Sequence, residues 1–221
     1  MSNSNAGGDP GNEWEDRGDV AWNEFDWERY LREQDEVIHR YLRFYESCRA
    51  EADRIDVVAE KMEWGNEVWE ESDGTGDSDD DAADSDDVYT LHKNPVYIAT
   101  KAIYLSLARS WNALAADSSK VPQPLAMALL TSMHRGEEQA AQAIHALDFG
   151  DYAMAVSLFK RAMSVLNGSL ALVNADAMAR LPHVQAWREQ ALSRFFDLRE
   201  VWLRVIAECR DELERPADEE G

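Results

Sequence analysis

Cysteine, proline and long apolar runs are all scarce in this chain of 221 residues. The two cysteines, Cys48 and Cys209, are far apart in the sequence, which gives no support to a disulfide framework or a cysteine metal site. We expect both to be buried free thiols, because each falls at an apolar position of a helical repeat. No run approaches the roughly 18 apolar residues of a membrane-spanning helix. The N-terminal residues also lack the pattern of a signal peptide, so we expect a cytoplasmic protein.

Positive charge is in short supply too, since 22 Lys and Arg stand against 44 Asp and Glu and leave a formal net charge of −22. Such a surface repels nucleic acid phosphates and anionic lipid, so we expect no direct binding to nucleic acid or membrane. It suits either a basic protein partner or a salt-rich cytoplasm. Ten of the acids lie in residues 70–87, where no apolar residue is larger than Ala. We predict a disordered acidic loop over residues 72–89.

Apolar residues repeat with helical spacing from Trp27 onward. Steps of four and three residues pass through Trp27, Leu31, Gln34, Ile38, Tyr41, Tyr45, Cys48, Ala52, Ile55, Ala59, Met62, Asn66 and Trp69. Eleven of these thirteen positions are apolar, which predicts one long, coiled-coil-like helix. Such a helix is longer than its neighbours can cover. Its surplus must pack on another copy of the chain, bend back, or stand out as an arm.

Four further helices follow from similar repeats. We expect them to begin near Pro95, Pro122, Tyr152 and Pro182, with short connections that place neighbours antiparallel. No stretch alternates with period two, so no sheet is expected. The predicted fold is all-α: an antiparallel helical bundle of four to five long helices with an extended N-terminal helix. The bundle spans residues 23–215 as a single domain. It lies between a disordered acidic and aromatic segment over 1–22 and a tail over 216–221.

Residues 146–163, ALDFGDYAMAVSLFKRAM, carry the small and large residues of a tightly packed helical hairpin. The matching positions are Ala143, Gly150, Tyr152, Ala155, Phe159 and Ala162. This spacing resembles one tetratricopeptide repeat, over about residues 136–168. The resemblance implies a hairpin of two close helices and, faintly, a peptide-binding role. No second copy stands 34 residues before or after it, as a solenoid would need.

Two pairs of side chains have the spacing of metal ligands. Glu36 and His39 form a Glu-x-x-His motif, which di-iron bundles use in two copies. His134 and Glu138 lie one turn apart on a predicted helix and can share a metal. Glu137 falls on an apolar seam, where we expect either an Arg from a neighbouring helix to pair with it or the position to lie near the edge of the bundle. No phosphate-binding loop or catalytic signature is present, and no cofactor is expected.

The sequence favours a non-catalytic bundle that acts through protein–protein contact as an adaptor, scaffold or assembly component. Large aromatics set among acids are the partner-binding candidates: Trp14, Trp22, Phe25, Trp64 and Trp69. We expect the partner to be a protein, and a basic surface on that protein would suit the negative charge of this chain. A second copy of the chain, bound through the long first helix as a homodimer, is one such partner. One alternative is a metal-binding enzyme or metal store that uses Glu36/His39 and His134/Glu138. Another is an acidic mimic that occupies a basic nucleic-acid-binding protein.

Overall fold

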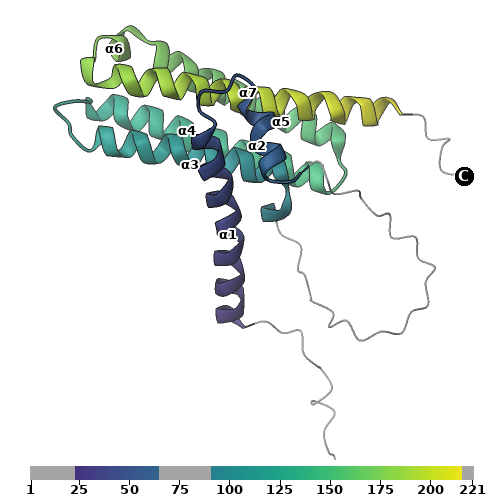
Figure 1. The fold of residues 1–221 in the computed structure, drawn as a ribbon. Coiled ribbons are helices and arrows are strands. Elements are labelled where there is room, and N and C mark those ends of the chain that lie inside the picture. Colours follow the sequence, from purple (N-terminus) through teal and green to yellow (C-terminus); the bar gives the residue numbers. More distant parts are fainter. Residues whose placement is uncertain (1–22, 65–90, 216–221) are drawn as a thin grey trace, which may run out of the picture.

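The computed structural model describes residues 23–64 and 91–215, which form helices and no strand (Figure 1). The all-α class predicted from the sequence is therefore confirmed. Three predicted segments lie outside the described residues: the disordered segment over 1–22, the acidic loop over 72–89 and the tail over 216–221.

Four long helices lie side by side and form the body of the molecule (Figure 1). They are α3 (Pro95–Ala115), α4 (Gln123–Asp148), α5 (Tyr152–Asn174) and α7 (Gln185–Glu214). Helix α3 packs on α4 and α7, and α5 packs on the same two helices, so each of the four has two neighbours. The short helix α6 (Asp176–Ala179) and the 3-10 turn η2 (Pro182–Val184) connect α5 to α7. These helices begin within a few residues of the positions expected from the apolar repeats.

The core between these helices includes three buried tryptophans, and each indole N–H is hydrogen-bonded. Trp111 and Trp202 are fully buried, and Trp187 is 8% exposed. Their indole nitrogens donate hydrogen bonds to the Ala126 carbonyl, the Thr100 hydroxyl and the Ser110 hydroxyl at 3.1, 3.1 and 3.0 Å. Burying tryptophan is favourable here because its large apolar surface leaves water without leaving an unpaired N–H.

Helices α4 and α5 form the most extensive contact of the fold. The turn between them uses Gly150 with a φ of 72°, a left-handed conformation that suits glycine at the end of a helix. The Asp151 side chain then caps α5 by accepting a hydrogen bond from the Met154 backbone N–H at 2.9 Å. Small residues allow the close approach, and those with no exposed surface are Ala140, Ala143, Ala155 and Ala162. Phe159, one of the positions of the tetratricopeptide resemblance, is also fully buried.

The first helix is shorter than the apolar repeat predicts. Helix α1 (Glu24–Ser47) ends before Cys48, and α2 (Arg54–Lys61) follows after a turn, so the expected single helix through Met62 is wrong. Trp64 stacks on Tyr41 with ring centroids 5.4 Å apart. In a continuous helix these rings would be separated by roughly 35 Å of rise. The chain has bent back, and the continuation to Trp69 lies outside the described residues.

Helix α1 also stands out from the bundle at its other end. It crosses the four long helices at a steep angle, and its first turns project away from them (Figure 1). It packs on α3, on α2 and on the 3-10 turn η1 (Leu91–Lys93). Of the three fates open to a long first helix, the structure shows two at once: the C-terminal part of the repeat bends back as α2, and the N-terminal part projects.

Candidate functional site

The projecting part of α1, residues 24–36, is called the arm from here on. Asn23 caps it: the Asn23 side chain accepts hydrogen bonds from the backbone N–H groups of Phe25 and Asp26 at 2.9 and 3.2 Å. The Asp26 carboxylate accepts one back from the Asn23 N–H at 3.3 Å. This reciprocal capping box defines where the helix starts without any help from the bundle.

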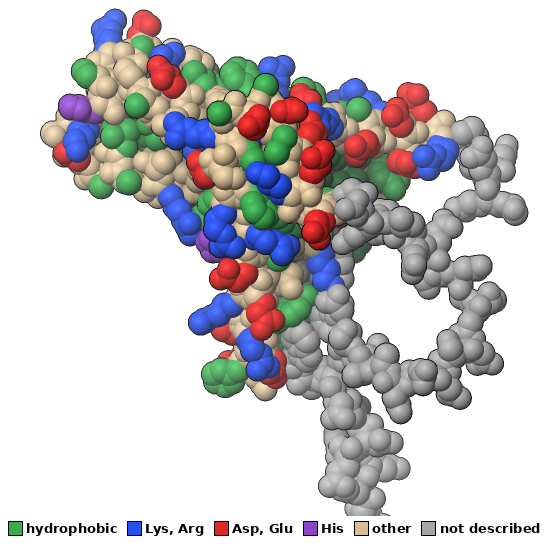
Figure 2. Space-filling view, viewed as in Figure 1, with side chains coloured by type: hydrophobic (Ala, Val, Ile, Leu, Met, Phe, Trp, Pro, Cys, Tyr) green, Lys and Arg blue, Asp and Glu red, His purple; other side chains and the backbone are tan. Residues whose placement is uncertain are grey.

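No residue of the arm is fully buried, although several are apolar. The exposed fractions are 75% for Phe25, 38% for Trp27 and 40% for Leu31. Figure 2 shows the arm as a narrow stalk with acidic and basic side chains along it. A helix of this length draws little stability from propensity alone, so such an element is usually completed by packing on something else.

The base of α1 is anchored by the same apolar stripe that the arm exposes. Ile38, Tyr41 and Tyr45 continue the repeat of Trp27 and Leu31, and each is at most 2% exposed. The Tyr41 and Tyr45 rings stack with centroids 6.0 Å apart. One helical face therefore changes from exposed to buried along a single helix, which fixes the arm to the bundle.

A buried ion pair joins this base to α7. Arg54 of α2 is 6% exposed, and its guanidinium pairs with the Asp197 carboxylate of α7. The Tyr45 hydroxyl donates a hydrogen bond to the same carboxylate, and Arg54 lies over the Tyr45 ring with its Cζ 4.8 Å from the centroid. Burial raises the pKa of Tyr45 above its usual value, and the negative charge of Asp197 raises it further. Tyr45 is thus held as a neutral donor.

A second ion pair lies beside the first and connects three helices. Arg194 of α7 donates to both carboxylate oxygens of Glu46, at 2.8 and 3.0 Å, and the Ser106 hydroxyl of α3 donates to Glu46 at 2.8 Å. Burial alone would raise the pKa of Glu46, but the hydrogen bonds from Arg194 and Ser106 lower it below its ordinary value. Sequence reasoning missed both pairs, because no local pattern places Arg54 or Glu46 against α7.

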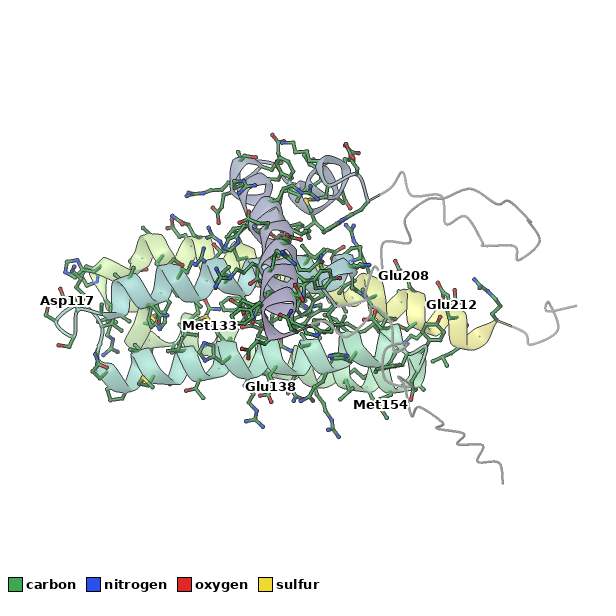
Figure 3. All side chains as sticks on the ribbon, turned by 90° about the horizontal axis from the view of Figure 1, so that it is seen from below. Asp117, Met133, Glu138, Met154, Glu208 and Glu212 are labelled. Carbon is green, nitrogen blue, oxygen red and sulfur yellow. The ribbon has the colours of Figure 1, made fainter. Side chains whose placement is uncertain are left out.

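Glu137, the acid on an apolar seam, does find a partner, but the partner is a lysine. Lys101 of α3 pairs with it, where the sequence had suggested an Arg. Burial would lower the pKa of Lys101, and the hydrogen bond to Glu137 raises it above its usual value. Both side chains line a cleft between α3 and α4 together with His134 and Glu138. Glu138 projects outward from α4 (Figure 3).

The two predicted metal-ligand pairs are not brought together. Glu36 and His39 line a different cleft, between α1 and α3, where Arg109 donates to His39 Nε2 at 3.3 Å. Within residues 23–64 and 91–215, no three His, Cys, Asp or Glu side chains gather closely enough to hold a metal ion. The four residues therefore do not form the single constellation that a metal-binding bundle requires. Cys48 and Cys209 are both buried free thiols, as predicted.

The predicted partner-binding aromatics fall into three groups. Phe25 lies on the arm and is the most exposed of those described. Trp64 is partly buried against the core and stacks on Tyr41, so its size is explained by packing. Trp14, Trp22 and Trp69 lie outside the described residues. Leu31 was not among the candidates, although its place on the apolar repeat and its exposed fraction of 40% single it out.

The negative charge is distributed very unevenly along the chain. The described residues hold 25 acids and 21 basic residues, a net charge of −4. The remaining residues, 1–22, 65–90 and 216–221, hold 19 acids and a single basic residue, Arg17. Within the described part, the arm alone carries six acids and two arginines, whereas residues 91–215 carry a net charge of +1. The charge-based expectation about partners therefore depends on particular segments and not on the helical body.

None of the described helices is long and apolar enough to cross a membrane. The chain matches no protein-family model, no curated protein and no solved structure.

Proposed function

We propose that this is a non-catalytic helical protein that acts through protein–protein contact, with the arm as its binding element. A single observation carries the proposal. Residues 24–36 form a capped helix that projects from the bundle and exposes Leu31 and Phe25, while the same helix is anchored firmly at its base by Tyr41 and Tyr45. A rigid base that carries a projecting helix with exposed apolar side chains is an arrangement that suits docking into a groove or onto another helix.

The polar junction with α7 supports this role. Two ion pairs, Arg54–Asp197 and Arg194–Glu46, set the position of α1 relative to the bundle. Buried ion pairs add little net stability, but they are satisfied in only one geometry. An arm held at a fixed angle loses less conformational freedom when it binds.

The proposal is tested by site-specific photo-crosslinking in the native host. A benzophenone side chain replaces Leu31 in one variant and Leu203 of α7 in the other, because these leucines are 40% and 42% exposed on helices. We expect crosslinked protein adducts from position 31 in clear excess over position 203. Equal yields at the two positions, or none at position 31, would rule out the arm as the binding element.

A further inference from the structure

A further cleft lies at the base of α1, where Lys and Arg side chains gather on the surface (Figure 2). It is called the junction cleft from here on, because α1, α2 and α7 all contribute to its lining. Its volume is about 260 Å³, slightly below the roughly 300–1,000 Å³ of pockets that hold drug-sized ligands, so it suits a small one. The lining residues used below are Glu46, Arg49, Arg54, Glu189, Ser193 and Arg194.

Three arginines line the junction cleft, and two of them are buried. Arg54 and Arg194 are 6% and 7% exposed, whereas Arg49, in the turn that follows α1, is exposed. Buried arginines are rare unless their charge and their N–H groups are matched by acceptors. The acceptors that the described residues supply therefore decide what else this cleft can hold.

The described residues do not satisfy all of these donors. A guanidinium carries five N–H groups. Arg194 donates to both oxygens of Glu46 from Nη2 alone, and its Nε is buried without a hydrogen-bond partner in the described structure. Arg54 donates from Nη2 to the Ser193 Oγ at 2.6 Å, and that hydroxyl keeps its own O–H to donate. The lining is thus rich in donors and short of acceptors, which favours an anion.

The charges of the lining point the same way, with one exception. The two buried arginines are neutralised by Glu46 and Asp197. Arg49 forms no ion pair with a described residue and is attracted only to Glu46, so it provides the unmatched positive charge. Glu189, which is exposed and also has no ion pair within the described ranges, opposes an anion. It therefore offers a direct test.

We propose that the junction cleft binds the phosphate group of a small phosphorylated molecule. Arg49 supplies the net attraction, and the buried arginines with Ser193 supply hydrogen-bond donors. Guanidinium groups match the spacing of phosphate oxygens. A tetrahedral phosphate presents oxygens in several directions and can accept from donors on three elements at once, whereas a planar carboxylate presents only two oxygens. This inference goes beyond the proposed function and does not depend on what the arm binds.

Calorimetric titration of the full-length protein tests the ligand class. The probes are inorganic phosphate, glycerol 3-phosphate and acetate, at neutral pH and at an ionic strength held constant with sodium chloride. We expect saturable binding of both phosphates, each at least about tenfold tighter than acetate. Acetate binding as tightly as the phosphates, or no saturable binding of either phosphate, would overturn the inference. Binding of inorganic phosphate alone would overturn the assignment of an esterified phosphate.

An exposed arginine provides the variant that locates the site. Arg49→Ala should weaken binding of glycerol 3-phosphate by about tenfold or more, because it removes the unmatched charge and leaves both buried ion pairs in place. Arg40→Ala is the matched control, since Arg40 is an exposed arginine of α1 outside the cleft, and it should leave the affinity unaltered. Equal effects of the two changes would indicate general attraction to basic side chains and would contradict a site in the cleft.

A second variant tests the cleft from the opposite direction. Glu189→Gln removes the opposing charge without removing a donor, so binding of glycerol 3-phosphate should tighten by about threefold or more. Glu208→Gln, at an exposed position of α7 outside the cleft, should not change it. Because this variant is expected to gain affinity, a folding defect cannot imitate the result. Unchanged or weaker binding by Glu189→Gln would show that the phosphate is not held in the junction cleft.

Discussion

Where α4 packs on α5, the buried side chains are mostly apolar and include several alanines, whereas α1 and α2 reach α7 through ion pairs that involve two buried arginines. On the two helices of the first contact, Ala140, Ala143, Ala155 and Ala162 have no exposed area. The second has Arg54 paired with Asp197, and Arg194 paired with Glu46. Close apolar packing is stabilised by van der Waals contact alone, so it tolerates small shifts in helix position. A buried ion pair loses most of its value if one partner is displaced, so it specifies where α1 lies.

The largest effect is expected where a charge would be left buried and unpaired. Asp197→Ala removes the partner of Arg54, which is 6% exposed, and leaves the Tyr45 hydroxyl without its acceptor. We expect a loss of about 3–5 kcal/mol in the free energy of unfolding, measured with urea at neutral pH. Glu200→Ala is the control, because its pair with Arg204 is about half exposed and should be worth under about 1 kcal/mol.

The double change Arg54→Met with Asp197→Leu follows from the same reasoning. It removes both charges at once and fills the space with apolar atoms, so most of the stability lost in Asp197→Ala should return. If the double variant is less stable than the single one, the junction is held by something other than this ion pair.

A smaller effect is expected in the apolar contacts, at a glycine where α4 meets α3. A Cβ added at Gly136 would overlap the Tyr104 hydroxyl and lie 3.3 Å from Tyr104 Cζ. The Tyr104 side chain is buried and 1% exposed, so it has little room to move. Gly136→Ala should therefore cost about 1–3 kcal/mol, in spite of the better helix propensity of alanine.

Gly168 of α5 is the matched control for this change. A Cβ at Gly168 meets nothing within 4 Å, and the residue lies inside a helix on the exposed side. Gly168→Ala should stabilise the protein by about 0.5–1 kcal/mol, because alanine loses less backbone entropy in a helix. A stabilising Gly136→Ala in the same urea series would show that Tyr104 does not pack closely against α4.

The smallest effect concerns the pH dependence of the polar junction. The pKa of Glu46 is lowered in the folded protein, so its contribution is fully present above the ordinary value of 4.5 and is lost as pH falls through the lower folded pKa. Wild type should thus be more stable than Glu46→Gln at pH 7, and the difference should shrink below about pH 4.5. The effect is modest because the Glu46 side chain is 38% exposed.

Urea midpoints measured between pH 7 and pH 3 provide the readout. Glu60→Gln, at an exposed position of α2, serves as the control and should show no comparable change in the difference. A Glu46→Gln variant whose deficit grows as the pH falls would contradict the assigned direction.

Much of the bundle could be predicted from the sequence, because its signals are local. Pro95 after Asn94 starts α3, where the Asn94 side chain accepts hydrogen bonds from Val96 and Tyr97 N–H groups at 2.9 and 3.2 Å. Gly150, which has a positive φ, lies in the turn that separates α4 from α5. Apolar repeats between such signals are sufficient to place α3, α4, α5 and α7, since each helix buries one face whatever its neighbours are.

The break after Ser47 was not predictable in this way. Neither Gly nor Pro stands between Cys48 and Asp53, and the apolar repeat continues through Ile55 and Met62 without interruption. The helix bends back because Arg54 pairs with Asp197, which lies 143 positions later in the sequence. In the bent conformation Val58 and Met62 are buried, and Trp64 stacks on Tyr41. An apolar repeat indicates only that one face of the helix is buried. It does not predict which surface will cover that face.

The sequence by itself therefore determined the helical class and the four long helices of the bundle. These depend on residue type, spacing and capping within one segment. The tertiary structure alone decided where α1 ends, which charges are buried and which stretch of the apolar repeat stays exposed. Those outcomes depend on contacts between residues far apart in the chain, where the free energy of packing α2 and α7 together exceeds the preference of residues 48–53 to continue a helix.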